Sequence, residues 1–270
     1  MSKIYVPELG LVRAIDEDNA EAYARENSQY ARGYEGRDYS RYPYGSMPWG
    51  STPFRTIPRS EWRERIEEGY KQKRFILHHQ LARDVPILNQ KRTPYCWVNA
   101  VVGAVMACRA AHGLRTVALS SASAGAPGKN YRAVGGWTGE AIGYCKRFGI
   151  VPQKYWPNDA IDRRYFEPTR KYAKYYNVGQ WYELRPRKFD EVMTALLLGY
   201  PVTVGLNWWG HAVYYSAPVH DSGRFGVVIT NSWGDGWEDG GRAVLMESKA
   251  TPDEVNIITS PLMKEWRGDD

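Results

Sequence analysis

The sequence predicts an α+β protein with two lobes and an extended N-terminal arm. Helical patterns dominate the middle of the chain, in residues 60–75 and in the nearly all-apolar run that follows Cys96. Short β-rich runs fill the last third and are separated by Gly, Pro, Asn and Asp: "PVTVGL", "AVYYSA", "FGVVIT" and "GRAVLME". Helical patterns first and strand patterns later are typical of an α+β fold.

The N-terminal part of the chain is expected to be an arm or linker over residues 1–57. Residues 12–29 predict a helix with a weak packing face, because their apolar side chains are few and small. Residues 30–58 are dense in Gly, Pro, Arg and Tyr and have almost no aliphatic side chains, so they cannot build a core. Three interpretations stay open: a flexible or disordered tail, a docking arm, and a propeptide-like cover.

The folded domain is expected over residues 58–270. It divides into a mainly helical lobe, a β-rich lobe and a C-terminal tail, at about 58–185, about 186–250 and 251–270.

Two helices of the first lobe have recognisable ends. Ser60 is a candidate cap for a helix that places Trp62, Ile66 and Tyr70 on one face. Further along, "GWTGEAIGYCKRFGI" predicts a helix that ends at Gly149.

Composition restricts the classes of function. The chain has 270 residues, 43% of them hydrophobic, which is enough for one large domain or two packed lobes. A net charge of +6 favours an acidic partner only weakly, because both signs are mixed along the sequence. Nucleic-acid binding through the basic, tyrosine-rich stretches at 30–74 and 169–188 is therefore a minor alternative.

The chain is expected to work in a reducing, intracellular (cytoplasmic) setting. Its N-terminus lacks the apolar core of a signal peptide, and no window reaches the roughly 20 apolar residues that span a bilayer. Cys96, Cys108 and Cys145 form no CxxC pair, and the histidines show no metal-ligand spacing. We expect no membrane contact, no metal and no cofactor; association with a larger assembly stays open.

Cys96 is a candidate nucleophile. A cysteine in the first turn of a helix lies near unpaired N–H groups and the positive end of the helix dipole, both of which stabilise a thiolate. Taken alone it is more often an inert buried thiol, which is how we interpret Cys108 and Cys145. Downstream, His211 precedes one strand-like run and Asn231 follows the next, so adjacent strands can bring a base and an orienting amide together.

This ordered set resembles the papain family of cysteine peptidases, over most of residues 86–247. The resemblance implies a papain-like fold with a helical lobe and an antiparallel, β-barrel-like lobe. The motifs that carry the resemblance are "NQKRTPYCW", "GHAV" and "NSWGDGW" with the Gly-Gly pair that follows it. By resemblance, Cys96, His211 and Asn231 form a catalytic triad, with Cys96 and His211 an ion pair at rest. Gln90, six residues before Cys96, is the side-chain donor of an oxyanion hole that the Cys96 N–H completes.

The resemblance also implies a substrate-binding surface beside the triad. Gly135 and Gly136 match a glycine pair that lies against an extended substrate backbone. Trp233 matches an indole that shields the His–Asn hydrogen bond. Trp209 and Ala212, which lie on either side of His211 in sequence, are further candidate substrate-binding residues.

The sequence departs from the family at two places. Thr93 and Pro94 replace a disulfide-bonded cysteine and its glycine before Tyr95, which crowds the wall near the scissile bond. Only "NWWG" connects a strand to His211, so Trp208 and Trp209 lie close to the base. Primary specificity and the openness of the site are left undetermined.

The expected function is hydrolysis of peptide or isopeptide bonds by a papain-like cysteine endopeptidase. The expected partner is a peptide or protein substrate. The alternative is a catalytically restricted papain-like interaction protein, docked into a larger assembly or self-associated through residues 1–57.

Overall fold

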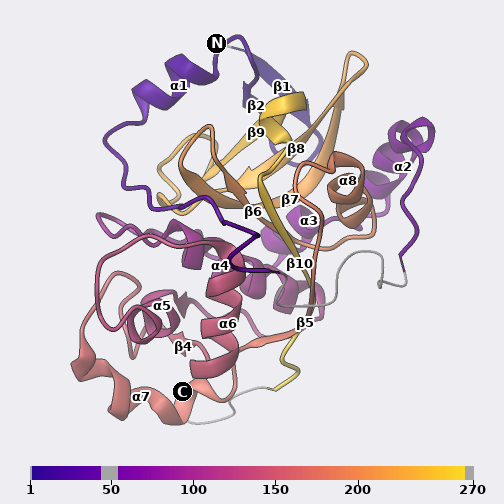
Figure 1. Ribbon diagram of the computed structural model, residues 1–270. Helices are drawn as coiled ribbons and strands as arrows, with labels where there is room; N and C mark the ends of the chain where they lie inside the picture. The colour runs from indigo at the N-terminus through magenta and orange to yellow at the C-terminus, as the bar shows by residue number, and fades with distance from the viewer. Residues whose placement is uncertain (1, 44–53, 265–270) are drawn as a thin grey trace.

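The computed structural model describes residues 2–43 and 54–264, and it confirms the α+β class (Figure 1). The helices are α1 Ala20–Glu26, α2 Arg59–Lys71, α3 Ile76–Ala82, α4 Cys96–Ala111, α5 Ala122–Gly128, α6 Thr138–Phe148, α7 Phe166–Ala173 and α8 Phe189–Leu197, with short 3₁₀ turns η2 Arg163–Tyr165 and η3 Glu247–Ala250. The strands are β1 Lys3–Val6, β2 Gly10–Ile15, β3 Leu119–Ser120, β4 Val151–Pro152, β5 Val178–Glu183, β6 Val202–Leu206, β7 His211–Asp221, β8 Arg224–Thr230, β9 Arg242–Met246 and β10 Glu254–Pro261.

The β-rich lobe is built on an open sheet in the order β1-β2-β9-β8-β7-β6-β10-β5. All neighbouring pairs are antiparallel except β2 and β9. The resemblance implies a barrel-like lobe, but the strands in the described part of the chain do not close into a barrel. Register brings Gly205 on β6 opposite both Ala212 on β7 and Glu254 on β10.

The helical lobe is centred on α4, which is buried along nearly its whole length. This helix packs against β7 of the sheet, and Gly103 allows the close approach because a Cβ there would lie 2.7 Å from the Tyr214 ring. Figure 1 shows α4 between the sheet above and the other helices of its lobe below. The N-terminus of α4, and Cys96 with it, is therefore held where the two lobes meet.

Several predicted elements agree with the structure, and two differ in detail. The helix after Cys96 and the helix ending at Gly149, which adopts a φ of +73°, are confirmed. The predicted cap at Ser60 is wrong, since α2 begins at Arg59 and its N-cap is Pro58. The helix expected over residues 12–29 is restricted to α1, because residues up to Ile15 pair in the sheet as β2.

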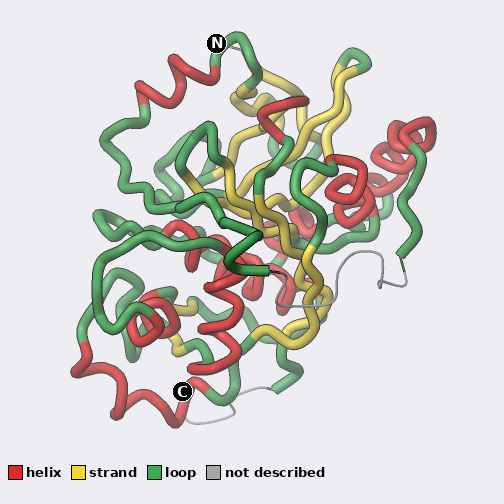
Figure 2. Tube along the Cα trace, viewed as in Figure 1, coloured by secondary structure: helices red, strands yellow, loops and turns green. Residues whose placement is uncertain are grey.

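The N-terminal residues are in contact with both lobes. β1 and β2 extend the sheet beside β9, and Ile4, Val12 and Ile15 are buried in its core. After α1 the chain continues without regular structure through the middle of the molecule, where Figure 2 draws it as a loop between sheet and helices. We call residues 30–37 the crossing segment.

Candidate active site

Cys96 is the first residue of α4 and is completely buried. Burial raises the pKa of its thiol from 9.0 to about 11, although backbone hydrogen bonds from Ala212, Gly33, Trp97 and Tyr34 oppose this by favouring the thiolate. Since the Ala212 backbone acts on the thiol, Cys96 lies near the start of β7, which begins at His211.

His211 and Asn231 are joined by a buried hydrogen bond. The His211 Nε2 atom lies 2.7 Å from Asn231 Oδ1, and the same oxygen accepts from the Ser232 backbone N–H at 2.7 Å. An amide oxygen only accepts, so His211 Nε2 carries the proton and Nδ1 keeps its lone pair. Among the described residues, His211 Nδ1 has no hydrogen-bond partner. Burial lowers the pKa of His211 to about 3, and the bond to Asn231 offsets only part of this effect.

Tryptophan rings enclose the imidazole of His211. The Trp233 ring centroid lies 4.5 Å from that of His211, and the Trp209 centroid lies 4.8 Å from it. Trp208 stacks on Trp209 at 5.4 Å with an interplanar angle of 9°. Trp209 of the short "NWWG" connection and Trp233 of the NSWG motif thus cover the histidine, and His211 and Asn231 are both buried.

Gln90 lies between the NSWG motif and the crossing segment. Its Oε1 accepts from the Ser232 hydroxyl at 2.6 Å, which fixes the direction of the amide. Its Nε2 donates to the Ala31 carbonyl at 3.0 Å and to the Thr93 carbonyl at 2.9 Å. Trp233 Nε1 also donates to the Ala31 carbonyl, at 3.2 Å.

The crossing segment follows the two glycines as an extended backbone. Gly136 N–H donates to the Gly33 carbonyl at 2.9 Å, and Glu35 N–H donates to the Gly136 carbonyl at 3.0 Å. These bonds make a parallel bridge between Tyr34 and Gly136. A Cβ on Gly135 would lie 2.6 Å from the Gly33 carbonyl oxygen, so a side chain there would obstruct this backbone.

The crowded wall at Pro94 also touches the crossing segment. A Cβ on Gly33 would lie 2.1 Å from the Pro94 carbonyl oxygen, so only glycine fits at this place. Tyr95 is buried and donates its hydroxyl to the Arg132 carbonyl at 2.8 Å. The sequence leaves the openness of the site undetermined; in the structure the chain itself fills it.

The structure brings together all the residues that the sequence selects, and it adds the crossing segment that motif reasoning missed. The sequence signal that could have indicated this segment is the pair of glycines in "ARGYEGR", because Gly33 permits a close approach of the backbone to Pro94.

Within residues 2–43 and 54–264, no three His, Cys, Asp or Glu side chains are grouped so as to hold a metal ion. In the same residues, no helix has both the length and the hydrophobicity to cross a bilayer.

Comparisons with known proteins identify the fold. No protein-family model matches the sequence, and no curated protein matches it. Procathepsin L 3 of the larval midgut of Tenebrio molitor is similar in structure, with a TM-score of 0.63 and 16% identity over 90% of this chain and 79% of that chain. A structure concerning the mite allergens Blo t 1 and Der p 1 gives 0.60 and 19% over 87% and 81%. Xylellain, a cysteine protease from Xylella fastidiosa, gives 0.59 and 15% over 86% and 97%. The chain therefore has the papain-like cysteine peptidase fold.

Proposed function

We propose that this protein is a cysteine peptidase that hydrolyses peptide or isopeptide bonds and is held inactive by its own crossing segment. Cys96 is the nucleophile, His211 the general acid and base, and Asn231 the residue that orients the imidazole. Gln90 Nε2 and the Cys96 N–H are the donors to the oxyanion.

The proposed reaction proceeds in two acyl transfers. The Cys96 sulfur attacks the substrate carbonyl, its proton passes to His211 Nδ1, and the tetrahedral oxyanion is held by Gln90 and the Cys96 N–H. His211 then protonates the leaving amine as the C–N bond breaks, which leaves a thioester on Cys96. Water, deprotonated by His211, attacks that thioester and releases the acid and the free thiol.

The observation that carries this proposal is the way in which the site binds the crossing segment. Gln90 Nε2 binds a peptide carbonyl, that of Ala31, and Gly136 binds the extended backbone of residues 33–35 through both its N–H and its carbonyl. These are the contacts that a peptide substrate needs. They also mean that a substrate enters only after the crossing segment leaves.

The docked interaction protein is not favoured. The described N-terminal residues have partners within their own chain, since β2 pairs with β9 and Tyr34 bridges to Gly136. The free thiols of Cys96, Cys108 and Cys145 support a reducing, intracellular setting as part of the proposal.

The test compares hydrolysis of a fluorogenic peptide library by the full-length wild type, Gly33→Ala, and Gly33→Ala combined with Cys96→Ala. The added Cβ of Gly33→Ala collides with the Pro94 carbonyl and displaces the crossing segment, so this variant should hydrolyse peptides at least about tenfold faster than wild type, a barrier change of about 1.4 kcal/mol. The variant without Cys96 should be inactive. Equal hydrolysis with and without Cys96, or none by any protein, would reject the peptidase assignment.

A further inference from the structure

Two buried carboxylates lie close to Thr138 and Gly139, shortly after the glycine pair Gly135 and Gly136 of the candidate active site. The side chains of Glu183 on β5 and Glu254 on β10 are 2% and 0% exposed. Glu254 accepts from the Thr138 and Gly139 N–H groups at 2.9 and 2.8 Å, which fixes its carboxylate at the start of α6. We call these two residues the acidic pair.

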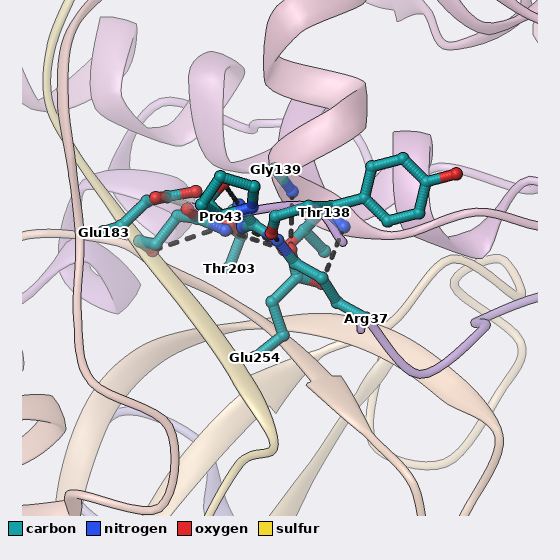
Figure 3. Close-up of polar contacts among 9 residues, drawn as sticks. Arg37, Pro43, Thr138, Gly139, Glu183, Thr203 and Glu254 are labelled. Carbon is teal, nitrogen blue, oxygen red and sulfur yellow. Dashed lines mark hydrogen bonds and ion pairs between the residues drawn. The ribbon is translucent and has the colours of Figure 1, made fainter. Parts of the chain in front are cut away.

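The acidic pair holds an arginine of the crossing segment. Figure 3 shows Arg37 reaching the carboxylates of Glu183 and Glu254. Its Nη1 lies 2.6 Å from Glu183 Oε1 and 3.7 Å from Glu254 Oε1, and its side chain is 5% exposed. A Cβ on Gly139 would lie 2.9 Å from that Nη1, so the glycine leaves the space in which the guanidinium fits.

The acidic pair lies on the same course of the crossing segment as the contacts made near Cys96. Gly136 bridges to Tyr34, and Arg37 is three residues further along the same segment, a span of roughly 10 Å for an extended chain. The Tyr34 ring covers Gly205, whose partners in the sheet are Ala212, next to His211, and Glu254 of the acidic pair. A peptide lying along Gly136 therefore brings one of its side chains to the acidic pair.

The chemistry of the acidic pair selects a guanidinium. Two carboxylates without contact to water require a cation, and a planar fork with several N–H donors satisfies both better than a single ammonium. The remaining donors of Arg37, Nε and Nη2, bind the carbonyls of Tyr42 and Pro43, which belong to the same N-terminal chain. The contribution of the folded domain is the acidic pair together with the space at Gly139.

We propose that the acidic pair is a specificity-determining subsite, which takes an arginine side chain of a peptide substrate once Arg37 has left it. This proposal rests on the proposed peptidase function, because it assigns the arginine to a substrate. Binding of a peptide through its arginine can be measured without turnover. In the described state Arg37 acts as the stand-in for that substrate residue.

Binding is measured first, without catalysis. The protein is the full chain with Cys96→Ala, Gly33→Ala and Arg37→Ala, and the probes are two fluorescein-labelled peptides with the sequence of residues 30–38, YARGYEGRD, one with citrulline in place of the second arginine. Citrulline keeps the shape and loses the charge. The arginine peptide should bind about 10- to 100-fold more tightly, the range expected for a charge-assisted contact. Equal affinities, or no binding of either peptide, would overturn the proposal.

Three further variants of the same protein assign the effect to the subsite. Glu183→Gln should bring the arginine-to-citrulline affinity ratio close to one, and so should Gly139→Ala, which keeps both carboxylates but fills the space of the guanidinium. Glu67→Gln, at an exposed carboxylate on α2, is the matched control and should keep the ratio. A ratio that survives both Glu183→Gln and Gly139→Ala would show that the arginine binds elsewhere and would overturn the proposal.

Hydrolysis separates this proposal from the proposed function. Gly33→Ala with Arg37→Ala, carrying Cys96, should cleave library peptides that contain arginine about 10- to 100-fold faster than those with citrulline at the same position. No cleavage, together with an intact binding ratio, rejects the peptidase and keeps the subsite. Cleavage that does not distinguish arginine from citrulline at any position rejects the subsite and keeps the peptidase.

Discussion

At the residue scale, burial decides the protonation of Cys96 and His211. The helix N-terminus and four backbone hydrogen bonds favour the thiolate, yet removal from water outweighs them and raises the thiol pKa to about 11. The same cause lowers the pKa of His211 to about 3. The covered site therefore holds a neutral thiol and a neutral imidazole. The ion pair implied by the family resemblance is expected only after the crossing segment leaves and water returns.

The first prediction concerns alkylation by iodoacetamide near neutral pH. In the wild type Cys96 should react slowly, like Cys108 and Cys145, because burial raises the pKa of all three thiols. In Gly33→Ala it should react at least about tenfold faster, as expected for a thiolate beside an imidazolium. Mass spectrometry of the labelled peptides gives the three rates. Gly236→Ala, where a Cβ meets nothing within 4 Å, is the control and should behave as wild type. Selective, rapid labelling of Cys96 in the wild type would contradict the covered state.

The second prediction concerns stability at acid pH. The unfolded chain protonates His211 near pH 6.5, whereas the folded chain does so only near pH 3, so the unfolded state binds more protons between these values. The free energy of unfolding therefore falls as pH drops through this window, by about 2 kcal/mol at about pH 5 from this group alone. Burial raises the pKa of Glu254, and this shift changes the free energy of unfolding with pH in the opposite direction.

Comparison with His211→Gln isolates the histidine from Glu254 and every other group. Urea unfolding of both proteins at a series of pH values should give a difference in the free energy of unfolding that shrinks as the pH is lowered. Curves that stay parallel between about pH 6.5 and 4 would show that His211 is protonated in the folded state.

At the element scale, α4 joins the two lobes, and its packing against β7 holds Cys96 beside Ala212. Gly103→Ala should lower the free energy of unfolding by about 1–3 kcal/mol, because the added Cβ would lie 2.7 Å from the Tyr214 ring in a packed interface. Denaturant unfolding measures this change. Gly143→Ala, on α6 with no heavy atom within 4 Å of the added Cβ, is the matched control and should raise the free energy of unfolding by about 0.5–1 kcal/mol. Equal effects of the two substitutions would contradict the tight α4–β7 contact.

The elements that could be predicted from the sequence are those that carry a local signal. The run after Cys96 is apolar on nearly every side, which is typical of a buried helix, and residues such as Gly149 mark helix ends. The spacing of Gln90, Cys96, His211 and Asn231 selected the site through a family resemblance, because no local rule joins side chains so far apart in the sequence.

The elements that could not be predicted depend on contacts distant in the sequence. Residues 12–15 fall within a weak helical pattern, yet they pair as part of β2 because β9, more than 220 residues later, offers a strand edge. The crossing segment has no periodic pattern, and its position depends on the missing side chains at Gly33 and Gly135 rather than on any preference of its own. The acidic pair comes from two strands that meet only in the folded sheet.

At the scale of the whole molecule, the crossing segment is fixed at both ends. On its N-terminal side, β2 pairs with β9, and Trp237 Nε1 donates to Asn27 Oδ1 at 3.1 Å. On its C-terminal side, Arg37 is held by the acidic pair. Because the crossing segment is held at both ends, a single break in the chain is not expected to release it from the site.

The last prediction follows from this anchoring. A recognition site for a specific protease is inserted after Pro43 and cleaved. Fragment 1–43 should then co-elute with the rest of the chain in size-exclusion chromatography. Alkylation of Cys96 should stay as slow as before cleavage. The reason is that β1 and β2 bury Ile4, Val12 and Ile15 in the core of the sheet, independently of the contacts at Cys96. The chain without the insertion, treated with the same protease, is the control. Adding Gly33→Ala to the cleaved protein should speed alkylation of Cys96 while the fragment still co-elutes, because this substitution displaces the crossing segment and leaves β2 in place. Loss of the fragment after cleavage alone, with rapid alkylation of Cys96, would mean that the strands do not anchor it and that a single cut is sufficient to open the site.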